Sequence, residues 1–177
     1  SLRAFPPSTA GLLAALAERA GPGSEGCAGD VTAVFSVLVA GSDMDEPVAD
    51  MVRGLLDGHV VLDRGIAERG RFPAVDLRRS VSRSLPRAAS AEENRLIAET
   101  RRLVAAREEA LPMVQAGLHR RGADPETDRA LDAHRALDAF LSARSEGPAE
   151  AFARLAAAVG EVSENAVENP GDRAGSG

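Results

Sequence analysis

The chain is organised around residues 41–83, where short apolar runs alternate with segments that favour helices. The central part reads Asp57-Gly58-His59-Val60-Val61-Leu62-Asp63-Arg64, and the stretch ends in Arg71-Phe72-Pro73-Ala74-Val75-Asp76-Leu77-Arg78-Arg79-Ser80-Val81-Ser82-Arg83. The apolar run predicts a short strand over residues 59–62. A short helix is expected to follow over 63–69, with Gly70 closing it, because glycine is favoured just past a helix C-terminus.

Further strand and helix signals lie on the N-terminal side of this stretch. Residues 31–40 are nearly all apolar and rich in valine, which predicts a strand buried on both faces and hence a parallel sheet covered by helices. A helix over 45–56 is expected to begin at Asp45-Glu46-Pro47, since acidic side chains and proline favour the first turn. Another helix is expected from Ser8 to near Gly21. This alternation predicts an α/β fold.

The composition changes after Pro86 to long runs of Ala, Arg, Glu and Leu, which predict only helices. Ser90 and Glu93 have the spacing of a capping box, so the first of these helices is expected to begin there. Pro112 predicts a kink or break within it. The chain therefore combines an α/β part with an all-helical part.

Two more helices and a tail complete the expected organisation. The helices are expected over 125–142 and 149–162, and the polar segment from residue 164 onward is expected to be disordered. We predict an α/β domain over 1–88, a helical domain over 89–163 and a disordered tail over 164–177.

The composition also excludes several classes of function. The formal net charge is −6, there are five phenylalanines and no tryptophan or tyrosine, and we therefore predict no nucleic-acid partner. Cys27 is the only cysteine, which excludes an internal disulfide and a cysteine-rich metal site and fits a cytoplasmic location. The three histidines are scattered along the sequence, so no zinc site is expected.

The sequence contains no lysine. A P-loop needs a lysine that reaches the β- and γ-phosphates of a bound nucleotide, so this motif cannot occur in the chain. We therefore expect the chain alone to hold neither ATP nor Mg²⁺ and to have no ATPase activity.

A series of short motifs matches one family in order and spacing from about Arg3 to Leu141. The matched pieces are Ala4-Phe5-Pro6-Pro7-Ser8, Ala17-Glu18-Arg19-Ala20-Gly21, residues 31–39, residues 43–50 and residues 56–62. They resemble the second half of the ATPase core in rotary and type III export ATPases, closest to the flagellar export and type III secretion ATPases. The resemblance implies a partial RecA-like P-loop NTPase core followed by an all-helical C-terminal domain. In that family both nucleotide-gripping motifs lie upstream of the matched Pro-Pro-Ser loop, so the chain looks like the C-terminal piece of a longer protein.

Arg83 falls where that family carries its arginine finger, in the sequence Ser80-Val81-Ser82-Arg83. The resemblance implies that Arg83 acts in trans and stabilises charge on the γ-phosphate held by a neighbouring subunit, a role that suits a planar guanidinium. The alternative is that Arg83 belongs to a solvated basic face with nearby arginines, or pairs with a carboxylate.

Phe72 and Pro73 stand where the family usually has Tyr-Pro-Ala, whose ring stacks on the adenine of the subunit's own nucleotide. Phenylalanine keeps the face of the ring and lacks only the hydroxyl, so the resemblance makes Phe72 and Pro73 candidate base contacts. The alternative is that Phe72 is a core or interface residue.

A third candidate site comprises Asp43, Met44, Asp45 and Glu46. These residues match the loop that faces the central stalk in rotary relatives, which implies contact with a coiled-coil stalk protein. The alternative is that the acids simply favour the N-terminus of the following helix.

The hairpin around residues 115–130 distinguishes the export ATPases from the catalytic subunit of ATP synthase. It resembles the export-ATPase pattern Gly-x-Asp-Pro-x-x-Asp-x-Ala, and its acids alternate with arginines, whereas the catalytic subunit of ATP synthase has a dense acidic run there. The resemblance implies that the full-length protein is a cytoplasmic homohexamer that uses ATP with Mg²⁺ to drive flagellar or type III protein export.

The partners that the resemblance implies are a central coiled-coil stalk protein, a stator, and secretion substrates or their chaperones. Contact with the membrane export gate would be peripheral at most. Two alternatives remain at this point: a non-catalytic truncated paralogue that binds the stalk or stator, and a subunit of a rotary ATP synthase.

Overall fold

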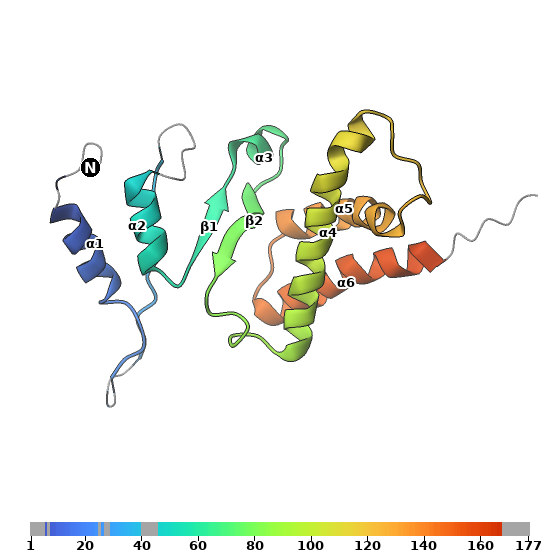
Figure 1. The fold of residues 1–177 in the computed structure, drawn as a ribbon. Helices are drawn as coiled ribbons and strands as arrows, with labels where there is room; N and C mark the ends of the chain where they lie inside the picture. Colours follow the sequence, from blue (N-terminus) through green and yellow to red (C-terminus); the bar gives the residue numbers. More distant parts are fainter. Residues whose placement is uncertain (1–5, 7, 25, 27–28, 40–45, 168–177) are drawn as a thin grey trace, which may run out of the picture. The chain divides into compact units, whose positions relative to one another are not determined.

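The computed structural model describes residues 6, 8–24, 26, 29–39 and 46–167, with side chains as far as Gly160 (Figure 1). The chain divides into two compact units, Ser1–His59 and Val60–Gly177. The first unit contains helices α1 and α2. The second contains most of strand β1, followed by helix α3, strand β2 and helices α4 to α6.

Two helices pack against each other in the first unit. α1 (Ser8–Ala17) and α2 (Pro47–Leu55) confirm the helices expected in these regions. Pro47 lies in the first turn of α2, where its missing N–H leaves no helical hydrogen bond unmade. The helix buries Ala49 and Val52, which lie three residues apart and so share one face.

The strand expected over 31–40 is wrong for the residues described. Residues 32–39 have no regular secondary structure, and Val31 pairs only in an isolated antiparallel bridge with Gly21. Val34 and Leu38 are 91% and 95% exposed. A strand forms only where a neighbour accepts and donates its ladder hydrogen bonds. No described segment pairs with residues 32–39, so an apolar composition alone does not make a strand here.

A two-stranded antiparallel sheet takes the place of the parallel sheet that was expected. β1 (Gly58–Leu62) and α3 (Arg64–Glu68) confirm the predicted short strand and helix. Asp63 caps α3 by accepting a hydrogen bond from the Ile66 N–H at 3.0 Å. Gly70 follows the helix with a φ of 84°, a conformation that favours glycine.

Strand β2 (Val75–Ser82) is missing from the sequence prediction. It pairs with β1, and the two strands run in opposite directions (Figure 1). The Asp63 N–H donates to the Ala74 carbonyl at 2.9 Å, and the Val61 N–H donates to Ser80 Oγ at 3.0 Å. The parallel arrangement depended on a strand at 31–40. The sheet that the structure describes contains only β1 and β2, which pair with each other.

Three long helices form the rest of the second unit: α4 (Ala91–Gln115), α5 (Pro125–Ser142) and α6 (Pro148–Val167). The capping box at Ser90 and Glu93 is confirmed, because each side chain bonds the backbone N–H of the other residue. Pro112 lies inside α4, which continues to Gln115, so the helix does not break there, and a kink at this proline stays a prediction. α5 has the predicted bounds.

The last helix extends further than predicted. α6 continues to Val167, so the expectation of disorder from residue 164 is wrong for 164–167, and the rest of that tail lies outside the described residues. Residues 164–167 contain neither glycine nor proline. Once a helix is nucleated, each further residue adds a backbone hydrogen bond at little cost.

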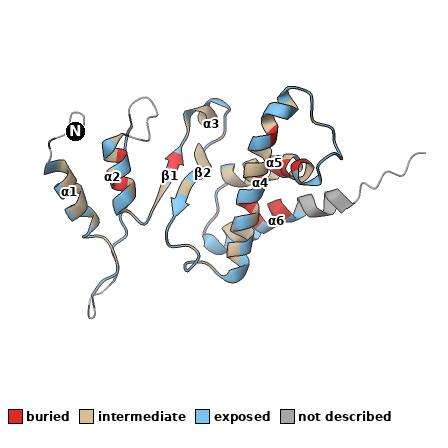
Figure 2. Cartoon of the chain, viewed as in Figure 1, coloured by how far each residue is buried: buried red, intermediate tan, exposed pale blue. Residues whose placement is uncertain are grey.

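The hydrophobic core of the second unit lies where α4, α5 and α6 meet (Figure 2). Its largest fully buried side chain is Leu103 of α4, which is 1% exposed. Several core positions are alanine, which lets the helix backbones approach closely. The core comprises Leu103, Ala130, Ala133, Leu137, Leu155, Ala158 and Val159.

No helix in the described part of the chain is both long enough and apolar enough to cross a membrane.

Candidate functional site

The loop between α3 and β2 presents Phe72 to solvent. The Phe72 side chain is 64% exposed, and the Phe72–Pro73 peptide bond is cis. The guanidinium of Arg71 donates hydrogen bonds to the Pro73 carbonyl at 3.4 Å and to the Val75 carbonyl at 2.8 Å. Phe72 is therefore not a core residue, and the backbone that follows it is held by its own neighbour.

Arg83 lies directly after the last residue of β2 and is exposed. The end of this strand is anchored at Ser80. Its carbonyl accepts a hydrogen bond from Arg101 of α4 at 3.1 Å, and its hydroxyl donates to the Asp76 carbonyl at 2.5 Å. The strand that leads to Arg83 is thus tied to the helical bundle.

The turn after Arg83 is closed by Asn94 of α4. The Asn94 side-chain amide lies 2.8 Å from the Pro86 carbonyl and 2.9 Å from the carbonyls of Ala89 and Ser90. Buried or half-buried carbonyls in a turn need such partners. Arg83 is therefore held between an anchored strand and a hydrogen-bonded turn.

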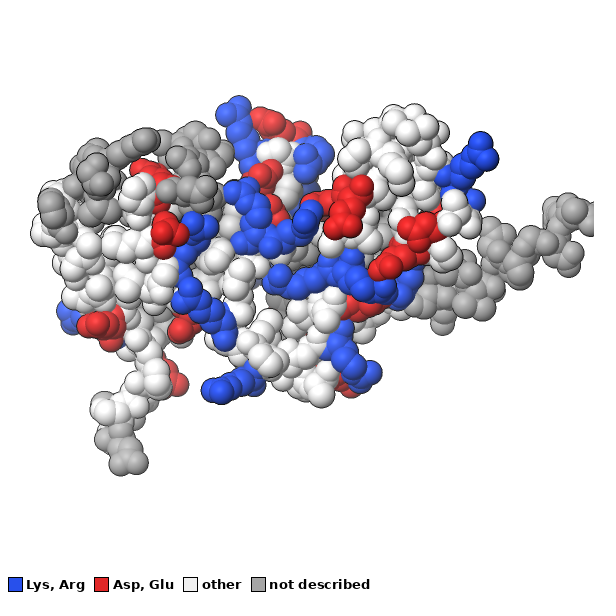
Figure 3. Space-filling model, in the orientation of Figure 1, with Lys and Arg blue, Asp and Glu red and all other residues white. Residues whose placement is uncertain are grey.

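Two arginines near Arg83 contact carboxylates. Arg78 donates to Glu108 of α4 at 2.5 Å, and Arg79 lies 3.6 Å from Asp63. The hydrogen bond to Glu108 raises the pKa of Arg78 above its ordinary value. Figure 3 shows arginines and carboxylates on the visible face. The two pairs place a carboxylate beside each of these arginines of β2.

Phe72 and Arg83 lie at opposite ends of β2. The strand has eight residues, so its two ends are seven residue steps apart. At a rise of about 3.3 Å per residue, these ends are roughly 23 Å apart. The structure therefore does not bring together the two residues that the sequence singled out.

The structure describes only one of the four residues expected to contact a stalk. Asp43, Met44 and Asp45 lie outside the described residues, and Glu46 is the N-cap of α2 without a side-chain capping bond. Asp50 is the acidic residue in the first turn of α2. The stalk role of this loop stays a prediction.

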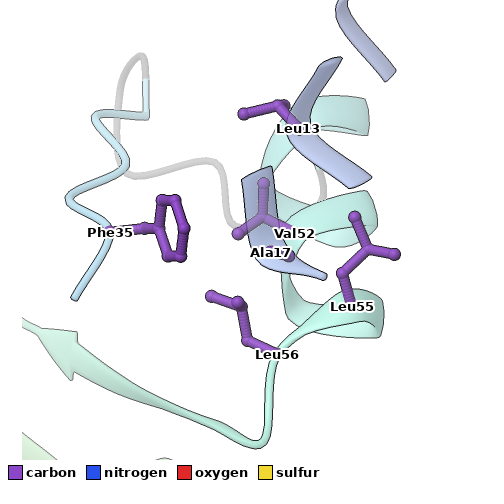
Figure 4. A pocket seen from close by; sticks show the side chains of 6 residues that line it. All are labelled: Leu13, Ala17, Phe35, Val52, Leu55 and Leu56. Carbon is purple, nitrogen blue, oxygen red and sulfur yellow. The ribbon is translucent and has the colours of Figure 1, made fainter. Parts of the chain in front are cut away.

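A small hollow in the first unit is lined only by apolar side chains (Figure 4). Phe35 points into it from the segment before α2, and the other side chains come from α1, α2 and the residue after α2. No polar group is present among them to orient a ligand. The lining consists of Leu13, Ala17, Phe35, Val52, Leu55 and Leu56.

Polar side-chain contacts hold the hairpin between α4 and α5. His119 Nε2 lies 2.9 Å from Asp128 Oδ1, and Arg121 contacts Asp132 at 2.5 Å. The Gly122 N–H donates to Asp128 at 2.6 Å, and this bond, with His119, lowers the pKa of Asp128. Of the acids and arginines noted in the sequence, Arg121 pairs with Asp132 of α5, whereas Glu126 and Arg129 pair with Arg102 and Glu99 of α4.

Sequence reasoning missed a cluster centred on Asp138 of α5. Asp138 Oδ1 lies 3.3 Å from Arg71 Nε, and Asp138 Oδ2 lies 3.3 Å from His134 Nε2. Burial lowers the pKa of His134, and the nearby guanidinium of Arg107 lowers it further. Burial also lowers the pKa of Arg107. Arg71 and Asp138 are far apart in sequence, and no motif links them.

Two family models match successive parts of the chain. Residues 1–82 match the nucleotide-binding domain of the ATP synthase alpha/beta family. Residues 89–157 match the C-terminal domain of the T3SS EscN ATPase.

Flagellar and type 3 secretion ATPases are similar in sequence to most of this chain. The flagellum-specific ATP synthase of Caulobacter vibrioides is 43% identical over 152 residues, which cover 80% of this chain and 34% of that protein. The SPI-2 type 3 secretion system ATPase of Salmonella typhimurium is 43% identical over 137 residues, which cover 77% of this chain and 31% of that protein. The chain spans about a third of the length of these relatives.

Solved structures agree with the sequence matches. The assembled ATPase EscN from the type III secretion system of enteropathogenic E. coli superposes with a TM-score of 0.80 at 33% identity, over 88% of this chain and 38% of that chain. EscN in complex with its central stalk EscO matches with a TM-score of 0.72 at 32% identity, over 89% and 36% of the two chains. The chain therefore belongs to the family of the flagellar and type III secretion ATPases.

Proposed function

We propose that this chain forms the C-terminal part of an ATPase that couples ATP hydrolysis to flagellar or type III protein export. The observation that carries the proposal is the order of the two matches, a nucleotide-binding domain followed by an EscN-type C-terminal domain. The chain spans about a third of the length of its relatives, so we propose ATP hydrolysis for a protein that also includes the rest of that length. We also propose a RecA-like core ending near residue 88 and a helical domain from residue 89.

Within this ATPase, Arg83 acts as the arginine finger. Its position at the exposed end of an anchored strand supports the role, because a group that completes a neighbour's site must reach outward from a rigid base. A guanidinium placed in trans stabilises the charge that develops on the transferred phosphoryl group.

Phe72 and Pro73 contact the base of the chain's own nucleotide. The exposed aromatic face of Phe72 is available for stacking. The separation of roughly 23 Å between the ends of β2 supports two nucleotides rather than one, since it keeps the base contact and the arginine finger apart. Phe72 would serve the chain's own site and Arg83 that of the next subunit.

The residues present fit only part of an ATP and Mg²⁺ site. An exposed ring and an exposed guanidinium suit a base and a phosphate, but the sequence has no lysine for a P-loop. Mg²⁺ would neutralise phosphate charge when bound. The phosphate cradle and the metal ligands would come from another part of the protein.

We propose the partners that this role requires. EscN forms an assembly and binds the central stalk EscO. By the same arrangement, this chain would belong to a cytoplasmic homohexamer whose loop at Asp43, Met44, Asp45 and Glu46 contacts a coiled-coil stalk. A stator and secretion substrates or their chaperones would be further partners, with the export gate at the membrane contacted peripherally.

The second candidate is a truncated paralogue that binds a stalk or stator without nucleotide. The absence of a P-loop lysine from these residues fits both candidates, because in the family that motif lies upstream of the matched part. The coding sequence upstream of Ser1 separates the two: an in-frame lysine-bearing P-loop supports the ATPase, and a start codon directly before Ser1 supports the paralogue. A rotary ATP synthase subunit is disfavoured because the hairpin around residues 115–130 lacks a dense acidic run.

The direct test uses a complete ATPase. If the gene's own product carries a P-loop, that product is used. Otherwise this chain is fused to the upstream part of the Caulobacter vibrioides relative. We expect Arg83→Ala to lower ATP turnover by about 10³ or more while nucleotide affinity stays nearly the same. Arg87→Ala changes another exposed arginine of the following turn and serves as the control. Unchanged turnover in Arg83→Ala would contradict the finger role.

A further inference from the structure

Arg71 joins the Phe72 loop to helix α5. Its Nη1 and Nη2 donate to the carbonyls of Pro73 and Val75, and its Nε lies 3.3 Å from Asp138 Oδ1. Each of the three guanidinium nitrogens thus has a different partner. The Pro73 carbonyl belongs to the loop, the Val75 carbonyl to the first residue of β2, and Asp138 to the helical bundle.

This arrangement is more protected from solvent than the other arginine pairs nearby. The Arg71 side chain is 14% exposed, whereas that of Arg64, which pairs with Glu68 on α3, is 84% exposed. Screening by water weakens an exposed pair much more than a half-buried one. The bridge through Arg71 is therefore the stronger restraint of the two.

Asp138 is itself held in place. Its second oxygen lies 3.3 Å from Nε2 of His134, one turn earlier on α5. Asp138, which is 41% exposed, thus has a contact on each oxygen and links α5 to Arg71.

We propose that Arg71 is a positioning residue for the base of the nucleotide, with Asp138 as its anchor on α5. The bridge fixes the backbone after Phe72, so that the ring stays exposed where a base can stack on it. The position of α5 in the helical domain is thereby coupled to the base contact. This inference rests on the proposed nucleotide role of Phe72.

The loop itself is tested first, in the 177-residue chain without nucleotide. Amide hydrogen exchange of residues 72–77 is expected to be faster in Arg71→Gln and in Asp138→Asn than in the parent chain. The matched control Arg64→Gln removes an exposed ion pair and is expected to leave exchange in this segment unchanged. Equal exchange in all variants would overturn the proposal.

Base contact is then tested in the complete ATPase, with ADP and inorganic tripolyphosphate as probes. We expect Arg71→Gln to weaken ADP binding about three- to tenfold, the range of a lost aromatic contact. Tripolyphosphate binding should be unchanged, because it has no base. The KM for ATP should rise with kcat preserved, and Arg71→Lys, which keeps the charge, should restore part of the ADP affinity.

The outcomes distinguish this inference from the proposed function. If Phe72→Ala weakens ADP binding and Arg71→Gln does not, the positioning role is wrong and the base contact stands. If Phe72→Ala leaves ADP binding unchanged, the base contact is wrong, and the positioning role falls with it. If Arg71→Gln weakens ADP and tripolyphosphate equally, its role is structural only, which also overturns the proposal.

Discussion

Exposure divides the residues of this chain into those that hold the fold and those available for contact. Leu103 is 1% exposed at the centre of the helical core, whereas Phe72 is 64% exposed and Arg83 lies on the surface. An exposed large aromatic ring contributes little to stability and is available to a ligand or a partner.

A core substitution should therefore act on stability. We expect Leu103→Ala to lower the free energy of unfolding by about 2–5 kcal/mol, because it removes buried apolar surface and leaves a cavity. Leu118→Ala alters a leucine that is 72% exposed and should have an effect within about 0.5 kcal/mol. Urea denaturation followed by circular dichroism measures both, and equal effects would contradict the assignment of the core.

A substitution at Phe72 should act on nucleotide affinity. In the complete ATPase, Phe72→Tyr should leave ADP affinity unchanged, because stacking uses the face of the ring. Phe72→Ala should weaken it about three- to tenfold. Titration with a fluorescent nucleotide measures this, and a loss in the tyrosine variant as large as in the alanine variant would rule out stacking.

At the scale of elements, the start of α4 depends on its capping box. We expect Ser90→Ala to lower stability by about 0.5–2 kcal/mol, because the Glu93 N–H loses its acceptor. Ser84→Ala, at an exposed position in the preceding turn, provides the control. Thermal unfolding of the two variants measures the difference, and equal midpoints would contradict the capping role.

The same box makes the stability of α4 sensitive to acid. The hydrogen bond from the Ser90 N–H lowers the pKa of Glu93 below its ordinary value of 4.5. A carboxyl whose pKa is lower in the folded state stabilises the fold above its unfolded pKa and loses that contribution as the pH falls through the folded pKa. We expect Glu93→Gln to lose less stability than the parent chain between neutral pH and pH values below 4.5.

At the scale of the whole molecule, the first unit exposes apolar surface that its own described residues do not cover. Val34 and Leu38 lie in a segment without regular structure and are almost fully exposed. Exposed apolar segments that lack strand partners favour association. We expect the isolated chain to self-associate, and Val34→Asp with Leu38→Asp to reduce this association, as measured by sedimentation velocity. Equal association in both forms would show that another surface is responsible.

The helices could be predicted from the sequence because their signals are local. The capping box at Ser90, the turn at Gly122 and the start of α5 at Pro125 each depend on residues within a few positions. The candidate residues Phe72 and Arg83 were found through a resemblance, and their roles stay predictions. The Arg71–Asp138 bridge could not be predicted, because it joins residues that only the packing of α5 brings together.

The sequence by itself determined the helical C-terminal half, the short strand at 59–62 and the absence of a P-loop, because these depend on local spacing and on which residue types are present. Only the tertiary structure decided that residues 32–39 form no strand, that β1 and β2 pair antiparallel, and that β2 separates Phe72 from Arg83. Strand pairing and ion pairs between distant residues are set by which segments meet in space. The periodicity of residue types along the chain does not indicate which distant segments meet.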